Sequence, residues 1–312
     1  MAETYIVTGG AGFIGSHIVE RLLRDGHRVR VVDNLSTGRR ENLAHLDGGF
    51  EFHPVSITDL KALTPIFAGA DTVYHQAALP SVPRSIDDPL TTHEYNVTGT
   101  LNVLLAARDA GVRRVVYAAS SSAYGDVEGE FKDETMPPRP LSPYGVAKLA
   151  GEYYCQAFTQ VYGLETVCLR YFNVFGPRQD PTSQYAAVIP LFITAMLDDR
   201  RPTIYGDGLQ SRDFTYIDNV VHGNLLAAQA PRAVGQVMNL ATGGRITLLD
   251  LVGKINALLG TRLEPIHAEP RPGDIKHSRA DIARARDLLD YTPVVDFDGG
   301  LARTVEWYRR QG

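Results

Sequence analysis

The stretch Thr8-Gly9-Gly10-Ala11-Gly12-Phe13-Ile14-Gly15 decides the fold of this chain. It follows an apolar run typical of a buried strand and leads into a segment with helical spacing of apolar residues, which is the setting that a dinucleotide-binding loop requires. Gly9, Gly12 and Gly15 allow a tight turn, close approach of backbone N–H groups to a pyrophosphate, and close helix–strand contact. A plain glycine-rich turn is the competing interpretation, and the flanking strand and helix argue against it.

Short apolar runs alternate with segments of helical period through the first half of the chain. The expected strands are residues 5–8, 28–32, 72–76, 115–120 and 166–171, and the expected helices are residues 14–25, 98–110 and 144–162. This alternation predicts an α/β fold with a doubly wound parallel (Rossmann) sheet.

The regularity weakens after residue 173. Pieces punctuated by proline and glycine, such as residues 175–181, 202–208 and 270–273, alternate with short helical stretches. We therefore expect a Rossmann domain over residues 1–173 and a smaller C-terminal α/β substrate domain, mainly residues 174–312, with segments that return to the first domain.

A carboxylate closes the second expected strand. Asp33 lies 18 residues after Gly15, where its oxygens can accept hydrogen bonds from both hydroxyls of an adenosine ribose. A carboxylate there repels a 2′-phosphate, so the sequence predicts NAD as cofactor. Arg39 and Arg40 lie nearby and keep NADP open, and a solvated loop aspartate is the alternative interpretation of Asp33.

A tyrosine and a lysine stand four residues apart at the start of an expected helix, so Tyr144 and Lys148 share one helix face. Ser120, Ser121 and Ser122 close the preceding strand, at the sheet edge where such folds bind ligands. We expect the Lys148 ammonium and a positive nicotinamide ring to lower the pKa of the Tyr144 phenol. A lone YxxxK pair is usually a surface pair, but together with the glycine loop and the strand-end serines it predicts a general base.

These motifs resemble the extended short-chain dehydrogenase/reductase family, and within it the UDP-sugar 4-epimerases, over essentially the whole chain. The matching stretches are TGGAGFIGSH (8–17), VVDNLSTG (31–38), YHQAALPSVPRS (74–85), ASSSAYGD (119–126), SPYGVAK (142–148), LRYFNVFGPRQDP (169–181), YGDGLQSRDFTYIDN (205–219) and RPGD (271–274). The resemblance implies NAD-dependent epimerisation at C4 of a UDP-hexose through a transient 4-keto sugar.

The resemblance also implies roles for individual residues. Ser120, Tyr144 and Lys148 are the implied catalytic residues, with Ser121 as a helper, and Asn96 braces the site. The implied cofactor-binding residues are Gly9, Gly12, Phe13, Ile14, Gly15, Asp33, Asn34, Ser36, Thr37, Gly38, Ser56, Ile57, Gln76, Ala77, Ala78, Asn96, Tyr144, Lys148, Tyr171 and Val174. The implied substrate-binding residues are Ser81, Val82, Arg84, Ser122, Asn173, Ala187, Val188, Tyr205, Arg212, Arg271, Asp274 and Ser278.

Arginines in the second half suit a nucleotide diphosphate, because a guanidinium group binds phosphate oxygens as a bidentate fork. We expect Asn173, Arg212 and Arg271 on the UDP phosphates, although arginines more commonly form surface salt bridges.

One departure from the family concerns the adenine end, where Ser56-Ile57 stands in place of the usual Asp followed by Ile or Leu. A serine still offers one hydrogen bond, so we expect weaker rather than abolished cofactor binding.

Other functions of nucleotide-sugar or NAD-binding proteins compete with epimerisation. A 4,6-dehydratase has an Asp-Glu pair after the strand-end hydroxyl residue, where this chain has Ser121 and Ser122, so dehydration lacks its acid and base. A decarboxylase acting on UDP-glucuronate would need dedicated recognition of the carboxylate, and Arg84 keeps a uronate substrate open, including that of a UDP-glucuronate 4-epimerase. A non-catalytic NAD-sensing protein is the alternative from another class, and such proteins typically lack the Tyr/Lys pair that Tyr144 and Lys148 supply.

Two finer expectations follow from the resemblance. Epimerases restricted to UDP-glucose and UDP-galactose carry a bulky tyrosine where this chain has Ser278, so we expect room for an acetamido group and UDP-N-acetylglucosamine/UDP-N-acetylgalactosamine as the preferred pair. The alternative is that Ser278 is a small loop residue and both kinds of sugar are accepted.

The expected helices 98–110 and 144–162 correspond to those that pair in the family, which implies a homodimer. The alternative is that the apolar stripes of these helices face only the sheet.

Composition narrows the remaining classes. The 312 residues are 44 % hydrophobic and 21 % charged with a formal net charge of −5, and no basic stripe suggests nucleic acid as a partner. Cys155 and Cys168 stand outside any CxxC or Cys/His cluster, so we expect neither disulfides nor a metal site. No apolar run approaches membrane-spanning length and no basic segment precedes the first strand, so we expect a cytoplasmic protein that makes no membrane contact.

Overall fold

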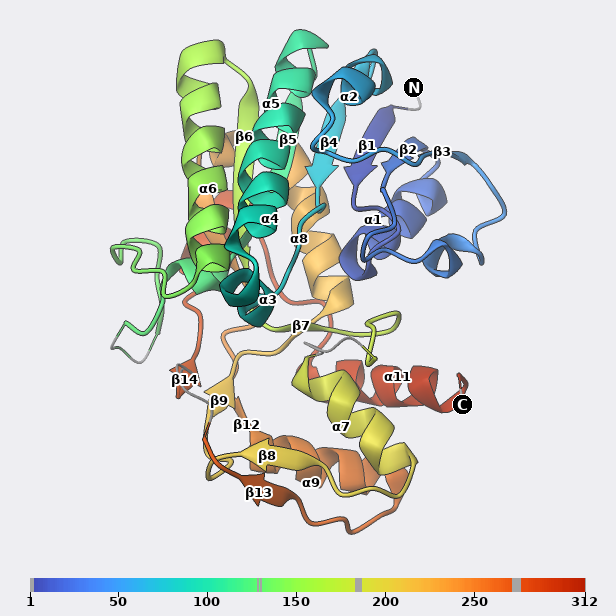
Figure 1. Cartoon of the computed structure of the whole chain (residues 1–312), viewed down its shortest axis with the longest axis vertical. Helices are drawn as coiled ribbons and strands as arrows, with labels where there is room; N and C mark the ends of the chain where they lie inside the picture. Colours follow the sequence, from blue (N-terminus) through green and yellow to red (C-terminus); the bar gives the residue numbers. More distant parts are fainter. Residues whose placement is uncertain (1–2, 128, 130, 183–186, 271–275, 312) are drawn as a thin grey trace.

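The core of the protein is a parallel sheet of seven strands, seen in a computed structural model that describes residues 3–127, 129, 131–182, 187–270 and 276–311. The strand order is β11-β6-β5-β4-β1-β2-β3 (Figure 1). The strands are β1 (Thr4–Thr8), β2 (Arg28–Val32), β3 (Phe50–His53), β4 (Thr72–His75), β5 (Arg114–Ser120), β6 (Glu165–Tyr171) and β11 (Val237–Leu240). Since β1 lies between β2 and β4, the order reverses at β1, which confirms the predicted doubly wound fold.

Helices cover both faces of this sheet because the strands alternate their apolar side chains between two cores. Ile6 of β1 belongs to one buried cluster, and its neighbours Tyr5 and Val7 belong to the other. On the Ile6 side lie α2 (Leu60–Phe67), α5 (Gly99–Asp109) and α6 (Pro143–Tyr162); on the other lie α1 (Phe13–Arg24) and α8 (Ile217–Gln229) (Figure 1). The three helices expected from sequence are α1, α5 and α6, each with ends within one residue of the expectation.

Local signals determine where the helix α6 begins and ends. Ser142 caps it, since its Oγ accepts a hydrogen bond from the Gly145 N–H at 3.1 Å, and Pro143 occupies the first turn. Gly163 ends it in the left-handed conformation, with φ of 71°. These signals place Tyr144 and Lys148 in the first two turns, at the end of α6 that meets the carboxyl edge of the sheet.

The second half of the chain builds several small sheets below the carboxyl edge of the large one (Figure 1). Strand β7 (Val174–Phe175) pairs with β10 (Thr215–Tyr216); β9 (Ser211–Arg212) lies between β12 (Ile246–Thr247) and β14 (His277–Ser278); β8 (Thr203–Tyr205) pairs with β13 (Ile266–Ala268). Its helices are α7 (Val188–Leu197), α9 (Leu248–Leu259), α10 (Ala283–Leu289) and α11 (Phe297–Arg309). Two elements of this half, α8 and β11, return to the large sheet.

Short helices surround the carboxyl edge of the large sheet. They are η1 (Arg40–Leu43), α3 (Val82–Asp87), α4 (Pro89–His93), the π-helix η2 (Glu94–Thr98) and η3 (Ser121–Ala123), whereas η4 (Pro231–Ala233) precedes β11 at the amino edge. None of the helices within the described ranges combines the length and apolar character needed to cross a membrane. Over the same ranges, His, Cys, Asp and Glu side chains form no group of three or more arranged to hold a metal ion.

Candidate active site

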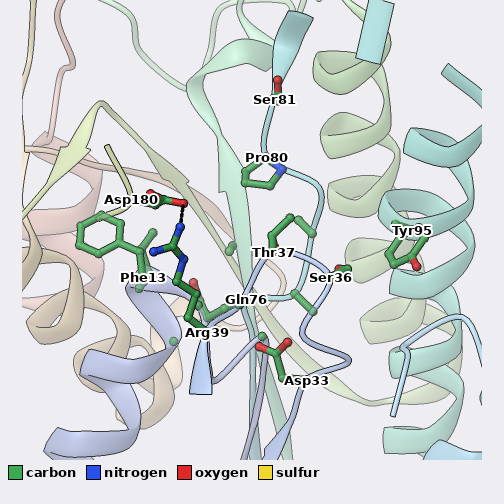
Figure 2. A pocket seen from close by; sticks show the side chains of 18 of the residues that line it. Phe13, Asp33, Ser36, Thr37, Arg39, Gln76, Pro80, Ser81, Tyr95 and Asp180 are labelled. Carbon is green, nitrogen blue, oxygen red and sulfur yellow. Dashed lines mark hydrogen bonds and ion pairs between the residues drawn. The ribbon is translucent and has the colours of Figure 1, made fainter. Parts of the chain in front are cut away.

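A cleft of about 800 Å³ opens at the carboxyl ends of β1, β2 and β4. It receives side chains from both halves of the chain, and Figure 2 shows Asp33 and Gln76 at its base. Of the predicted cofactor-binding residues it is lined by Gly9, Gly12, Phe13, Ile14, Gly15, Asp33, Asn34, Ser36, Thr37, Gly38, Ser56, Ile57, Gln76, Ala77, Ala78, Tyr144, Lys148, Tyr171 and Val174. The parallel sheet therefore brings together residues from six separate stretches of sequence.

The glycine loop between β1 and α1 fits a dinucleotide pyrophosphate. Gly9 has φ of +68°, and a Cβ at Gly15 would lie only 2.1 Å from the Gly9 carbonyl oxygen, so neither position admits a side chain without distortion. Gly12 caps α1 without a side-chain hydrogen bond, which leaves the first-turn N–H groups directed toward the cleft. Such a helix N-terminus is suited to phosphate.

The Asp33 carboxylate lies at the end of β2 and is 7 % exposed. Its oxygens accept hydrogen bonds from the backbone N–H of Ala11 at 2.9 Å and of Leu35 at 2.8 Å. Burial raises the pKa of this carboxyl group, and the two hydrogen bonds act in the opposite direction. Each oxygen keeps lone-pair capacity for a further donor, so the site fits the ribose hydroxyls of NAD.

Tyr144 and Lys148 both line the cleft from α6. Lys148 is 4 % exposed, its Nζ donates a hydrogen bond to the Ala118 carbonyl oxygen at 2.8 Å, and burial lowers its pKa to about 8. Burial raises the pKa of Tyr144, and a hydrogen bond with Ser120 partly offsets that effect, while the lowering expected from Lys148 together with a nicotinamide ring stays a prediction. The physical reason is that the phenol is removed from water while the Lys148 ammonium is directed to a backbone carbonyl.

The serines after β5 form a short hydrogen-bonded chain beside Tyr144. Ser122 donates from its Oγ and from its backbone N to the Ser120 Oγ, at 2.9 and 3.2 Å. The Ser120 hydroxyl is thereby oriented toward the phenol with which it interacts. Ser120 and Ser121 lie just beyond Ala118 and Ala119, the two residues of β5 that line the cleft.

Comparison with known proteins places this geometry in a family. The NAD dependent epimerase/dehydratase family matches residues 5–241. The chain belongs to this family. A UDP-glucose 4-epimerase of Mycolicibacterium smegmatis is 41 % identical over 311 residues, with 98 % of each chain covered.

Two solved structures extend the comparison. The UDP-N-acetylglucosamine 4-epimerase of Methanobrevibacter ruminantium, in complex with UDP-N-acetylmuramic acid, has a TM-score of 0.96 and 40 % identity over 100 % of both chains. The UDP-glucuronic acid 4-epimerase of Bacillus cereus, in complex with UDP-glucuronic acid and NAD, has a TM-score of 0.91 and 33 % identity over 99 % of this chain and 100 % of the other. These comparisons confirm the predicted family, the epimerase class of enzyme and NAD as cofactor.

Other predicted residues of this epimerase support the cleft from behind. Asn96 does not line it but holds its wall, since the Asn96 amide accepts a hydrogen bond from the Leu79 N–H at 2.8 Å and donates to the Leu79 carbonyl at 3.1 Å. Ser56 lines the cleft, and its hydroxyl is already hydrogen-bonded to the Thr58 hydroxyl at 2.8 Å.

The predicted substrate-binding residues are spread more widely. Ser81, Arg84 and Ala187 line the cleft, whereas Val82, Ser122, Asn173, Val188, Tyr205, Arg212 and Ser278 lie beyond its lining. Arg271 and Asp274 fall outside the described residues. The Asn173 amide donates to the Asp213 carbonyl oxygen at 3.2 Å, and a parallel pairing of β14 with β9 places Ser278 opposite Arg212.

A loop of the second half supplies cleft residues to which the sequence assigned no role. Arg39 from the loop after β2 pairs with Asp180 at 2.6 Å, and Figure 2 shows this pair beside Phe13. Arg178 belongs to the same loop, and its side chain pairs with Glu20 of α1 at 2.6 Å. The lining residues of this loop are Arg178, Gln179, Asp180 and Thr182. The GPRQDP stretch was the available signal, because it forms the end of the matching stretch LRYFNVFGPRQDP (169–181).

An aromatic residue and an amide in the cleft wall were also missed. Tyr95 lines the cleft from the π-helix η2, and its hydroxyl accepts a hydrogen bond from the Asn34 amide at 3.3 Å. Asn224 of α8 accepts hydrogen bonds from the Tyr171 hydroxyl at 3.0 Å and from the Gln76 amide at 3.3 Å. No local pattern marks either residue, because each reaches the site only through packing of a distant helix.

Proposed function

We propose that this enzyme is a UDP-hexose 4-epimerase that prefers UDP-N-acetylglucosamine and UDP-N-acetylgalactosamine and also accepts UDP-glucose and UDP-galactose. Support for the UDP-hexose comes from the relatives named above, all of which are described as UDP-sugar 4-epimerases. Support for the acetylated pair comes from one residue, Ser278.

In the proposed reaction, Tyr144 acts as the general base and takes the proton of the C4 hydroxyl, with Ser120 hydrogen-bonded to the same oxygen. The glycine loop and Asp33 would hold NAD, whose nicotinamide ring would supply the hydride acceptor and donor for C4. The Lys148 ammonium favours the phenolate form of Tyr144 electrostatically. The 4-keto sugar turns its other face before the hydride returns, and the proton on Tyr144 goes back to the C4 oxygen.

This rotation of the 4-keto sugar requires that the enzyme bind the diphosphate tightly and the hexose loosely. Binding energy at the remote end keeps the ketone from escaping while the ring rotates. We assign the diphosphate to Arg212 and Asn173, and also to Arg271, which lies outside the described residues.

The acetylated substrate rests on the position of Ser278. It is 9 % exposed and lies opposite Arg212 in the β14–β9 pair, and its carbonyl oxygen accepts a hydrogen bond from the Asp213 N–H at 2.8 Å. A small side chain beside a predicted phosphate ligand leaves space on the sugar side that a tyrosine would fill. Such a difference in pocket size contributes about 1–3 kcal/mol to discrimination.

A second candidate substrate is a UDP-hexuronate. Arg84 of α3 lines the cleft near Ser81, and a guanidinium group there suits a sugar carboxylate. The same residue also suits a phosphate, so the acetylated hexose stays the first candidate.

We further propose a homodimer formed through α6. Val146, Tyr153 and Val161 are spaced seven and eight residues apart, share one face of this helix, and are 54 %, 57 % and 69 % exposed. The sheet therefore does not cover this apolar face, and a second copy would. Light scattering at micromolar concentration tests the assembly, and a monomer mass contradicts it.

Incubation of the purified enzyme and NAD with each UDP-sugar, followed by chromatographic separation of the epimers, tests the function. We expect the two acetylated sugars to interconvert fastest. Bound NAD without conversion of any UDP-sugar would favour an NAD-sensing role instead, and fastest conversion of UDP-glucuronate would favour the second candidate.

A further inference from the structure

A buried ion pair joins the catalytic helix α6 to the strand β6 on which this helix packs. Arg170 of β6 binds Glu152 of α6 as a bidentate fork, with Nε to Oε1 at 2.9 Å and Nη2 to Oε2 at 2.7 Å. The side chains are 6 % and 2 % exposed. Water does not screen such a pair, so its charges act on neighbouring groups more strongly than those of a surface pair.

Both partners belong to elements that carry site residues. Glu152 follows Lys148 by four residues on α6, which places the two side chains on one helix face with Cβ atoms about 5–6 Å apart. Arg170 directly precedes Tyr171, which lines the cleft. The pair therefore joins the catalytic helix to the strand beneath the cofactor.

A third element is attached through an aromatic ring. The Arg170 guanidinium lies over the ring of Tyr124, 4.5 Å from its centroid, and the Tyr124 hydroxyl donates to the Asn239 Oδ1 of β11 at 2.7 Å. Tyr124 follows η3, the turn that begins just after Ser120. The ion pair thus contacts the three elements that position Ser120, the Tyr144/Lys148 pair and Tyr171.

We propose that Glu152 and Arg170 are positioning residues for the general base: the paired charges keep Lys148 cationic and hold it, with Tyr144, in register against β5 and β6. The proposal deepens the proposed function, on which its kinetic test rests. The pair is electrically balanced, so loss of either partner leaves one buried charge of known sign beside Lys148.

The surroundings of Lys148 explain why this balance matters. Its Nζ has the Ala118 carbonyl as hydrogen-bond acceptor and lies 5.0 Å from the ring centroid of Tyr117. The described ranges place no carboxylate within ion-pair distance of it. The titratable neighbours are Tyr144 on its own helix turn, Cys155 and Glu152 farther along α6, and His75 of β4, whose pKa burial lowers to about 3, so that it is neutral. Burial lowers the pKa of Lys148, and Cys155 and, to a smaller extent, Glu152 oppose that fall; Glu152 is the carboxylate among these neighbours.

Two single substitutions give shifts of opposite sign. Glu152→Gln leaves the Arg170 cation unbalanced, which disfavours the Lys148 ammonium and moves the alkaline limb of the pH–rate profile down by about 0.5–1 pH unit. Arg170→Met leaves the Glu152 carboxylate unbalanced and moves the same limb up by about the same amount. The double variant Glu152→Gln/Arg170→Met restores the position of the limb.

A second readout needs no substrate. The phenolate absorbance of each variant is titrated against the same variant carrying Tyr144→Phe, and the difference reports the Tyr144 titration alone. If no UDP-sugar is converted by the parent enzyme, the proposed function fails while this titration still decides the present inference. Asp287→Asn, which breaks an exposed ion pair with Arg232, serves as the matched control and should shift neither measurement.

A purely structural pair would lower stability in both single variants without moving either titration, or would move both in the same direction, and either result overturns the proposal. If the single variants do not fold, Arg170→Lys decides, because it keeps the charge and loses the bidentate fork. We then expect kcat to fall at least about fivefold with an unshifted alkaline limb and unchanged KM, and full kcat in Arg170→Lys overturns the proposal.

Discussion

The cofactor end and the substrate end of this enzyme are built in different ways. At the cofactor end, the loops after β1, β2 and β4 meet at one edge of a continuous parallel sheet, and nearly every residue predicted there lines one cleft. At the substrate end, short strand pairs such as β9 with β14 join segments more than 60 residues apart, and most of the predicted residues lie beyond the cleft lining.

This difference has a physical origin and a consequence. Parallel strands must end at the same edge, so residues at strand ends meet whatever the rest of the chain does. The ends of short strand pairs need not meet at one edge, because the register of these pairs depends on long-range contacts. Substitutions at the cofactor end should therefore have large effects on chemistry or NAD binding, and substitutions at the substrate end should have smaller effects on which sugar is used.

The largest effect is expected for Tyr144→Phe, which tests whether the chemistry belongs to the sheet edge. Loss of the hydroxyl removes the base while the ring still packs, so turnover should fall by about a hundredfold or more. Epimer separation by chromatography measures turnover, and NAD binding with an unchanged melting temperature is the control. Near-normal turnover would remove Tyr144 from the mechanism.

Next is Asp33→Ala, which removes the acceptor for the adenosine ribose. Hydrogen bonds to a charged group contribute about 1.5–3 kcal/mol, so NAD affinity should fall by about tenfold to a hundredfold while NADP binding is unchanged or improves. Calorimetric titration with both dinucleotides measures the ratio. Tighter binding of NADP than NAD by the unsubstituted enzyme would already contradict the assignment of Asp33.

At the substrate end, Ser278→Tyr should narrow the sugar specificity. The ring should fill the space for the acetamido group and cost acetylated substrates about 1–3 kcal/mol in kcat/KM, while UDP-galactose is spared. Parallel assays with UDP-N-acetylglucosamine and UDP-galactose give the ratio. Equal turnover of UDP-N-acetylglucosamine by variant and parent would show that Ser278 is not the determinant.

Two glycine substitutions, one in the cofactor loop and one in α9, test how tightly the backbone of the cofactor loop is packed. Gly15→Ala forces a Cβ to within 2.1 Å of the Gly9 carbonyl and should lower stability or NAD affinity by about 1–3 kcal/mol. Gly253→Ala in α9 is the matched control, because a Cβ there has nothing within 4 Å and alanine favours a helix. Thermal unfolding with and without NAD compares the two variants; equal behaviour would argue against a tight glycine loop.

The smallest expected effect is the response to alkaline pH. Burial lowers the pKa of Lys148 to about 8, so raising the pH through that value removes the ammonium that favours the Tyr144 phenolate. Turnover should then decline by up to about tenfold per pH unit above 8. Initial rates at several pH values, with NAD saturation checked at each, measure the decline, and a flat profile up to pH ~10 would show that Lys148 stays charged.

The sequence by itself determined the parallel α/β fold, the glycine loop, Asp33 and the Tyr144/Lys148 pair. Each of these depends on residues that are near in sequence or stand at strand ends, so spacing alone places them. Only the tertiary structure decided that β11 completes the sheet, that Tyr95 and the Arg178–Asp180 loop close the cleft, and that Glu152 of α6 meets Arg170 of β6. It also decided that burial raises the pKa of Tyr144, because burial depends on the packing of the whole chain, and no local pattern of residues encodes how much water that packing removes.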